Sequence, residues 1–332
     1  MAFDMLIGNA ELRWRLARDV QQHTLAHAYI LEGPEGSGKR TLARAIAAAL
    51  TCQGEGTSLP CMQCAACRKV FSGNAPDVVY VTRSEDKASI GVDEVRFLRT
   101  DVLFAPNDTD HKIYVIEEAD LLTDAAQNAL LLTLEEPPEY VTFLLLCRRS
   151  SALLETVRSR APVLRLMPVP SHEIGQYLEK TTPAFAALGE KERQEVLLLA
   201  DGSVGRAIVL SNEQERRPLM ERRQITCAYL DAVLERKDAA ALLGLMSRFE
   251  LKRDVLIVQL EDIETALRDL VLLKRSDHAP LRFYTDREQV LALSEQISLS
   301  SLLALYDRVE QTRAAVQRNA NIRLALTDLL LG

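Results

Sequence analysis

The sequence predicts an α/β domain with a mostly parallel sheet, followed by regions made of helices. Short apolar runs alternate with helical patterns as far as residue 165, which is typical of such a sheet. The pattern changes after Pro168 and Pro170, and helical periodicity continues from there. Aromatic residues make up only 5% of the 332 residues, while Ala and Leu are abundant, so helices are expected to dominate.

Five apolar runs are interpreted as the buried strands of the sheet. They are residues 28–33, 77–82, 112–118, 142–147 and 161–166. Helices are expected between them, at residues 41–50, 93–104 and 124–136. Together these elements predict an α/β domain over residues 1–166.

Two helical domains are expected after the sheet. A helix start at Ser171 opens the first, which we place at residues 167–210. The second comprises residues 211–332, and Asn321 is expected to cap its last helix, residues 322–331. One apolar helix face is predicted in this second domain, at Leu256, Leu260, Ile263, Leu267 and Leu270.

Composition and charge limit the classes of function. The sequence has no run of about 18 uncharged apolar residues, the length that a membrane-spanning helix needs. The N-terminus is charged and lacks the apolar core of a signal peptide, so we expect a cytoplasmic protein. The net charge is −7, whereas a protein that holds nucleic acid by itself usually carries a basic surplus. Contact with DNA is therefore expected to be local or to be made by partner subunits.

A glycine-rich segment, residues 33–39, follows the first predicted strand and precedes a predicted helix, which is the context of a Walker A phosphate loop. The glycines allow backbone N–H groups to face a polyphosphate, and Lys39 would reach the outer phosphates of ATP or ADP. The alternative is a glycine-rich turn without a ligand. The candidate binding residues are Gly33, Gly36, Ser37, Gly38, Lys39, Arg40, Thr41 and Glu117.

The residue after the lysine departs from a magnesium-binding phosphate loop. It should be Ser or Thr, whose hydroxyl ligates Mg²⁺, but here it is Arg40, with Thr41 one place late. A guanidinium cannot coordinate a cation, and a shift of one helical position turns a side chain by about 100°. Nucleotide binding is compatible with this change, whereas hydrolysis that depends on Mg²⁺ is in doubt.

A second acidic motif follows the third predicted strand. Glu117 and Glu118 lie at its end, in the position of a Walker B motif, where the first acid holds Mg²⁺ and the second polarises the attacking water. The first acid is usually Asp, so the longer Glu117 is a further departure, whereas Glu118 is correctly placed for a catalytic base. The alternative is a pair of solvated acids at a strand end.

Four cysteines, Cys52, Cys61, Cys64 and Cys67, lie within 16 residues directly after the phosphate-loop helix. Their spacing suits four thiolates around one Zn²⁺ ion. The loop between the first two is polar and rich in Gly and Pro, so metal binding rather than burial would order it. All four ligand positions would be filled, which indicates a structural zinc site; a redox pair and incidental thiols are the alternatives.

In this order, the motifs resemble the clamp-loader branch of the AAA+ ATPases over almost the whole chain. Residues 27–41 resemble the family's entry into its phosphate loop, and residues 112–138 resemble its Walker B strand and the helix ending in LEEPP. A zinc module after the phosphate-loop helix is characteristic of bacterial delta-prime and gamma/tau subunits. The resemblance implies a P-loop AAA+ domain with a zinc module at about residues 52–67, a small helical lid domain (167–210) and an all-α collar domain for oligomerisation (211–332).

The resemblance also implies a catalytic role for one arginine. Residues 156–161, TVRSRA, match the family's SRC signature with its Cys replaced by Ala, and Arg160 corresponds to the arginine that reaches a neighbour's ATP. Such an arginine stabilises the charge of the transferring phosphoryl group. Ser159 would position its loop. The alternative is a surface arginine without this function.

Further departures indicate which subunit the chain resembles. Cys147, Arg148 and Arg149 stand where a motor subunit keeps the threonine that senses the γ-phosphate, and Arg206 comes one place late for the second sensor arginine. Together with the changes at positions 40 and 117, they indicate a nucleotide site that is not kept for hydrolysis. The retained finger and the altered site resemble delta-prime of bacterial DNA polymerase III.

The resemblance implies a hetero-pentamer with delta and gamma/tau subunits that loads the sliding clamp onto primed DNA. The chain would then be part of the holoenzyme of a DNA-directed DNA polymerase without being an active ATPase alone. One alternative is an active gamma/tau-type motor, in which Lys39, Thr41 and Glu118 still run hydrolysis. Another is a zinc-bearing AAA+ factor of recombination or repair.

Overall fold

A computed structural model describes residues 3–54, 59–84, 87, 89–234, 244–284 and 286–331. The chain divides into two compact units, one of Met1–Tyr177 with Gly202–Arg206 and one of Leu178–Asp201 with Ala207–Gly332. Residues 55–58 of the predicted zinc module and residues 235–243 of the predicted collar lie outside the described residues. The division into three domains stays a prediction.

The first unit contains a five-stranded sheet in which every strand pairs in parallel, in the order β2-β3-β4-β1-β5. All five predicted strands are confirmed. They are β1 (Ala28–Glu32), β2 (Val78–Val81), β3 (Lys112–Ile116), β4 (Val141–Cys147) and β5 (Val163–Arg165). Every residue of β3 and β4 is buried, because helices cover both faces of the sheet.

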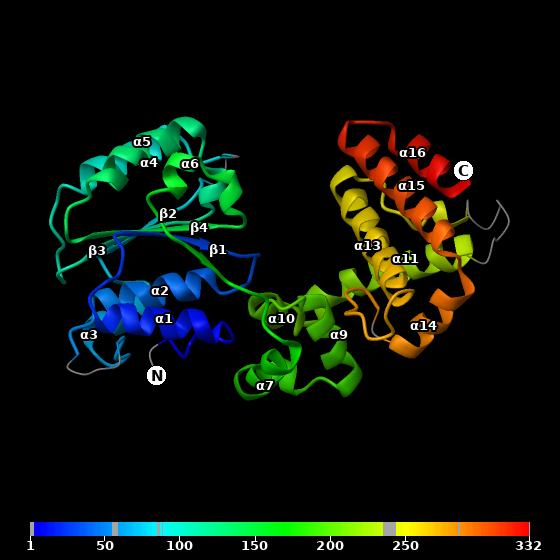
Figure 1. The fold of residues 1–332 in the computed structure, drawn as a ribbon, viewed down its shortest axis with the longest axis horizontal. Helices are drawn as coiled ribbons and strands as arrows, with labels where there is room; N and C mark the ends of the chain where they lie inside the picture. The colour runs from blue at the N-terminus through cyan, green and yellow to red at the C-terminus, as the bar shows by residue number, and fades with distance from the viewer. Residues whose placement is uncertain are drawn as a thin grey trace. The chain divides into compact units, whose positions relative to one another are not determined.

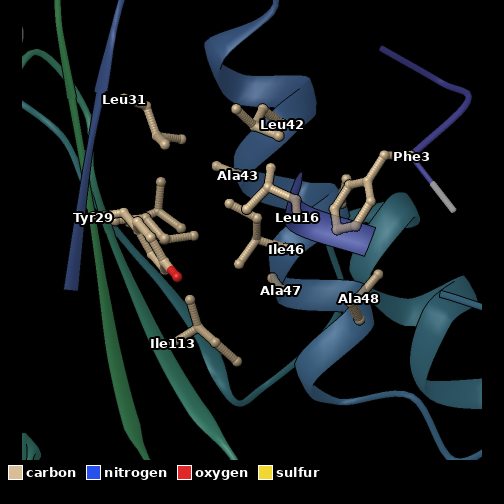
Figure 2. Packing of buried hydrophobic residues seen from close by; sticks show 14 of the residues in the cluster. Phe3, Leu16, Tyr29, Leu31, Leu42, Ala43, Ile46, Ala47, Ala48 and Ile113 are labelled. Carbon is tan, nitrogen blue, oxygen red and sulfur yellow. The ribbon is translucent and has the colours of Figure 1, made fainter. Parts of the chain in front are cut away.

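Six helices form the two layers around the sheet in the described part of this unit (Figure 1). Helices α1 (Ala10–Gln21), α2 (Lys39–Leu50) and α3 (Ala65–Ser72) lie on one face, and α4 (Val92–Asp101), α5 (Asp124–Glu135) and α6 (Glu155–Arg158) lie on the other. In Figure 2, Leu42 and Ile46 of α2 point toward Tyr29 and Leu31 of β1. The run of alanines beside them lets α2 pack closely against its neighbours, and five of its alanines are buried.

The second unit is helical as predicted. Two helices, α7 (Ser171–Thr181) and α10 (Val204–Leu210), cross the division and belong partly to each unit. The other described helices of the second unit are α8 (Pro183–Ala186), α9 (Glu190–Ala200), α11 (Glu213–Leu234), α13 (Arg253–Leu273), α14 (Arg287–Gln296), α15 (Leu299–Gln317) and α16 (Ile322–Leu331). The predicted apolar face of α13 is fully buried. Asn321 caps α16, since its Oδ1 accepts from the N–H groups of Arg323 and Leu324 at 3.0 and 3.2 Å.

The parallel sheet determines where the candidate site lies. The phosphate loop follows β1, Glu117 follows β3, and Cys147 ends β4. Because the carboxyl ends of parallel strands meet at one edge, these positions come together in the fold. Among the described residues, no helix is sufficiently long and apolar to cross a membrane.

Candidate functional site

Residues 33–39 form the predicted loop between β1 and α2. Gly36 and Gly38 have φ of 71° and 96°, in the left-handed region that glycine favours. Helix α2 begins at Lys39 with no side-chain cap and no acidic residue in its first turn. Its first N–H groups therefore lack helical partners, and this end of the helix can hold an anion.

Lys39 and Ser37 provide further groups for a phosphate. The Lys39 amine donates to the carbonyl oxygens of Gly33 and Pro34 at 2.6 and 2.8 Å, so it lies within the loop. Burial lowers the pKa of Lys39, and the nearby Asp120 carboxylate opposes this effect. The buried Ser37 Oγ has no hydrogen-bond partner within the described part of the chain. The residues of the loop thus fit a polyphosphate, which would pair with both side chains.

The outer side of the loop contacts the segment predicted as a degenerate second sensor. Gly205 N–H donates to the Gly36 carbonyl at 2.9 Å, and Ser203 Oγ donates to the Glu35 carbonyl at 3.0 Å. A Cβ atom at Gly36 would lie only 2.4 Å from Ser203 Oγ. Arg206 itself is exposed. Ser203 and Gly205 therefore support the loop, a role that the sequence did not predict.

Arg40 and Glu117 lie together and form a bidentate ion pair. Arg40 Nε donates to Glu117 Oε1 at 2.5 Å, and Arg40 Nη2 donates to Oε2. The hydrogen bond to Glu117 raises the pKa of Arg40. These are the two positions expected to hold Mg²⁺. Arg40 is a cation without a free lone pair, and it neutralises the Glu117 carboxylate. The two residues therefore do not fit a Mg²⁺ ion.

Glu118, the candidate base, lies beside a different cation. It adopts a left-handed conformation with φ of 50°, directly before the short 3₁₀ helix Ala119–Leu121. Its side chain is half exposed and pairs with Arg83 at 3.5 Å. The predicted sensor stretch is also paired, because Arg148 contacts Glu35 of the phosphate loop at 3.1 Å.

The four cysteines come together as predicted. Their sulfur atoms lie within 4.8 Å of one another, and those of Cys61 and Cys67 are 4.0 Å apart. A tetrahedral Zn²⁺ with bonds of about 2.3 Å needs sulfur atoms about 3.8 Å apart. The N–H groups of Cys61, Cys64 and Cys67 donate to the sulfurs of Cys52, Cys61 and Cys64 at 3.3–3.4 Å. These four thiols could hold a metal ion.

The sulfur environments differ within this cluster. Burial opposes ionisation of Cys64, but hydrogen bonds from the backbone of Cys67 and Gln53 and from the Cys67 and Cys61 thiols together outweigh it and lower the pKa of Cys64 to about 6. The Cys64 N–H lowers the pKa of Cys61. Burial raises the pKa of Cys52 and Cys67. Two of the four sulfurs are thus disposed to be thiolates, the form that binds a metal.

Arg160 lies away from the groups around the phosphate loop. Its Nη1 donates to the Thr156 carbonyl at 2.8 Å and to Ser159 Oγ at 3.3 Å, and its Nη2 pairs with Glu135 at the end of α5. Among the described residues, no contact joins it to the chain's own phosphate loop. Ser159 was predicted to position the loop; its contact with the arginine and the contact with Glu135 were not predicted.

Two family models match most of the chain. Residues 8–170 match the model described as DNA polymerase III, delta subunit, and residues 218–332 match the model described as DNA polymerase III, delta subunit, C terminal. The chain belongs to the DNA polymerase III clamp-loader family. The parallel sheet and the phosphate-loop segment agree with the AAA+-like fold of this family.

Several clamp-loader relatives are similar to the chain in sequence. DNA polymerase III subunit tau of Bacillus subtilis is 28% identical over 86% of this chain and 48% of its own length. Subunit delta' of Yersinia pestis is 40% identical over 42% of each chain. The chain thus spans about half the length of the curated relatives it matches. A gamma subunit-related protein of Thermotoga maritima gives a TM-score of 0.46 at 16% identity, with 96% of each chain covered.

Sequence reasoning identified the residues of this clamp-loader site better than their pairings. Arg40 and Glu117 were each predicted as separate departures, but not as partners. The sequence carried a signal for this pairing: a basic residue stands where a magnesium-binding loop has a neutral ligand, and the acid of the second motif is longer than the usual Asp by one methylene. Such a change at two positions of one site favours an ion pair between them.

Proposed function

We propose that the chain is a delta-prime-like subunit that helps the clamp loader place a sliding clamp on primed DNA in the cytoplasm, without hydrolysing ATP itself. The observation that carries this proposal is the Arg40–Glu117 ion pair. A motor subunit uses these two positions to hold Mg²⁺, which neutralises the charge that develops during phosphoryl transfer. Here the chain's own guanidinium and carboxylate satisfy each other.

Other contacts support a site that does not hydrolyse ATP. The ion pair between Glu118 and Arg83 occupies the carboxylate that would polarise the attacking water. Arg148 pairs with Glu35 at the position of the first sensor. Each contact alone would be tolerable in an ATPase, but together they engage the charged side chains at positions 40, 117, 118 and 148.

Arg160 is proposed to act on the ATP of a neighbouring gamma/tau subunit. It is one-third exposed, its guanidinium is oriented by Ser159 and the Thr156 carbonyl, and its contact with Glu135 involves an exposed carboxylate. An exposed ion pair is worth only about 0–1 kcal/mol, so a neighbour's phosphate can displace Glu135 at little cost.

The cysteine cluster and the helical residues 167–332 are proposed to stabilise the subunit and to hold it in the clamp-loader ring. The cysteine cluster would bind one structural Zn²⁺. Residues 167–210 and 211–332 would form the lid and the collar. Val258, Leu303 and Leu324 expose apolar surface on three collar helices, which supports contact with delta and gamma/tau subunits in a hetero-pentamer.

Single-turnover ATP hydrolysis by the isolated, zinc-loaded chain tests the proposal. We expect no turnover above the background of the Lys39→Ala variant, because the Mg²⁺ positions are occupied by Arg40 and Glu117. Turnover that depends on Lys39 would contradict the proposal and would favour a motor subunit of the gamma/tau type.

A further inference from the structure

The Arg40–Glu117 pair leaves one edge of the guanidinium unused. Both hydrogen bonds to Glu117 come from the Nε and Nη2 edge, and Nη1 has no partner among the residues that the structure describes. The Glu117 side chain is 11% exposed, whereas that of Arg40 is 62% exposed. Glu117 therefore fixes the guanidinium from the buried side, and its free donors remain accessible from solvent.

The free edge belongs to the second residue of α2. This is the same helix end that carries Lys39, the unpaired N–H groups and the buried Ser37 hydroxyl. All of these groups favour an anion. An arginine fork matches phosphate oxygens in geometry and keeps its charge at every physiological pH, and here hydrogen bonding raises its pKa further.

Mg²⁺ and the guanidinium would compete for the same role. In an ordinary phosphate loop the ion neutralises the outer phosphates and is held by a hydroxyl and an acid. In this chain the acid holds Arg40 instead. A second cation beside the guanidinium would meet like charge and would find no free protein oxygen at either position.

We infer that the Arg40 guanidinium, held by Glu117, takes the place of the magnesium ion, so that the phosphate loop binds a nucleoside diphosphate or triphosphate without a divalent cation. This inference rests on the proposed function, since a site that never hydrolyses ATP does not need a catalytic metal. The bound nucleotide then serves as a fixed structural ligand of the loop.

Titration calorimetry with ADP on the zinc-loaded chain tests this inference. Magnesium is removed with a resin rather than a soluble chelator, so that the cysteine site keeps its metal. We expect the same Kd within about twofold with and without Mg²⁺, a difference of about 0.4 kcal/mol. A tightening of tenfold or more by Mg²⁺ in the wild-type chain would overturn the inference, whatever the variants do.

Variants at positions 40 and 117 distinguish the effect of the Arg40 charge from the effect of its forked hydrogen-bonding geometry. Arg40→Ala is expected to weaken ADP binding without Mg²⁺ by about tenfold or more, because a charge-assisted hydrogen bond is lost. Arg40→Lys keeps the charge but not the fork, and should restore only part of the affinity. The double change Arg40→Thr with Glu117→Asp rebuilds an ordinary magnesium site and should make ADP binding depend on Mg²⁺.

The outcomes distinguish this inference from the proposed function. If ADP binds in neither buffer, the metal-free nucleotide site is wrong, but the absence of hydrolysis and the action of Arg160 on a neighbour are unaffected. If Arg40→Ala binds ADP as tightly as the wild-type chain without Mg²⁺, the guanidinium has no part in binding and the inference also fails. Hydrolysis by the wild-type chain would instead refute the proposed function.

Discussion

At the scale of single residues, the Arg40–Glu117 pair affects chemistry more than stability. The Arg40 side chain is 62% exposed, and ion pairs with an exposed partner contribute about 0–1 kcal/mol to folding. The same pair decides whether two ligand positions can hold Mg²⁺. The fold therefore loses little when the pair is removed, and variants at these positions are suited to functional tests.

Gly36 should be less tolerant of substitution than another left-handed glycine. Gly36→Ala adds a Cβ that meets Ser203 Oγ at 2.4 Å and the Arg206 nitrogen at 2.8 Å, whereas Gly73 has a similar φ of 76° and open space around it. Gly73→Ala should cost only backbone strain of about 1–2 kcal/mol. Gly36→Ala should cost more and weaken nucleotide binding, as measured by thermal unfolding and ADP titration. Equal losses of stability would contradict the contact between the loop and Ser203.

The sequence predicted single residues by their motifs, but it did not predict their partners. Lys39 and the four cysteines were predicted from motif order and spacing, and Arg160 was predicted from the resemblance to the family's SRC signature. The contacts of Glu118 with Arg83 and of Arg160 with Glu135 join residues that are 35 and 25 positions apart. Pairings at such separations depend on how the strands and helices pack, and single-sequence periodicity does not specify this.

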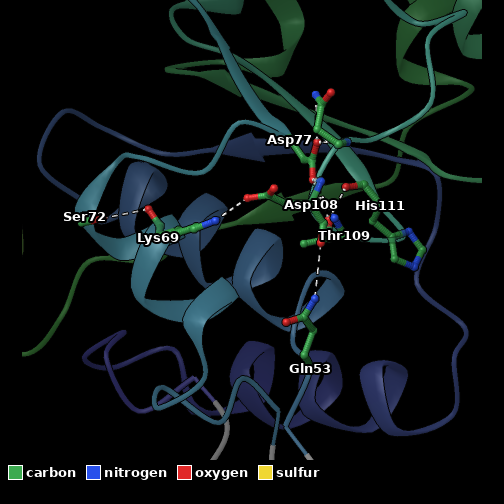
Figure 3. A network of polar contacts seen from close by, with 8 residues as sticks. Gln53, Lys69, Ser72, Asp77, Asp108, Thr109 and His111 are labelled. Carbon is green, nitrogen blue, oxygen red and sulfur yellow. Dashed lines mark hydrogen bonds and ion pairs between the residues drawn. The ribbon is translucent and has the colours of Figure 1, made fainter.

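At the scale of elements, a polar network joins the cysteine module to the edge of the sheet (Figure 3). The buried Asp77 carboxylate accepts N–H groups from Asn107, Asp108 and Thr109 at 2.5–2.9 Å. Lys69 of α3 then pairs with the Asp108 side chain. The module is thus attached to the loop before β3 as well as to the end of α2.

Loss of the Asp77 charge should destabilise the chain in a pH-dependent way. Burial opposes ionisation, but the hydrogen bonds from Asn107, Asp108 and Thr109 together outweigh it and hold the pKa of Asp77 below its usual value. This stabilisation is fully present above the unfolded-state pKa of about 3.9 and is lost as pH falls through the lower folded-state pKa. Asp77→Asn should therefore cost about 2 kcal/mol between pH 5 and 7, and less below about pH 4.

Urea unfolding of both chains across this pH range checks the prediction. Protonation of the four clustered cysteines affects both chains alike, so the difference between them isolates position 77. If the difference in the free energy of unfolding between the wild-type and Asp77→Asn chains already disappears between pH 7 and 5, the pKa of Asp77 is not lowered.

The cysteine module should depend on one bound zinc ion. Cys64→Ser is expected to lose the metal and to lower the melting temperature by about 4–8 °C, as a loss of about 2 kcal/mol would in a domain of this size. Cys227→Ser, a change at a half-buried cysteine outside the cluster, is the matched control and should keep the metal. Metal analysis and thermal unfolding measure both effects. A Cys64→Ser chain with a full equivalent of zinc would refute the site.

The sequence predicted the elements well because their patterns are strong. Strands β3 and β4 are continuous apolar runs, and α13 repeats its leucines at helical spacing. Helices α1 and α3 were not predicted. Helix α1 carries several charged residues and exposes Trp14, and α3 is short and depends on a cap from the Cys64 sulfur.

At the scale of the whole molecule, the family could be recognised from the order of its motifs. A phosphate loop, a cysteine module, an acidic strand end and an SRC-like turn follow one another as in clamp-loader subunits, and the family models match the same regions. The proposed action of Arg160 on a neighbouring subunit is harder to predict from one chain, because it depends on the active site of that neighbour.

A nearby arginine provides a control for the action of Arg160 on a neighbour. Arg158, the last residue of α6, is exposed and lies two positions before Arg160. Arg158→Ala removes one positive charge from the same turn as Arg160→Ala does. If the position of Arg160 matters and not the local charge, Arg158→Ala should leave ATP turnover by the complex unchanged.

The most direct test measures DNA-stimulated ATP turnover by a clamp loader reconstituted from this chain with delta and gamma/tau subunits. Arg160→Ala should strongly reduce turnover at the neighbouring site, since such an arginine is worth roughly 10³–10⁵ in rate. Lys39→Ala should reduce turnover far less, because under the proposed function the chain's own loop does not hydrolyse ATP. The opposite pattern, loss with Lys39→Ala and no change with Arg160→Ala, would contradict the account and identify a motor subunit.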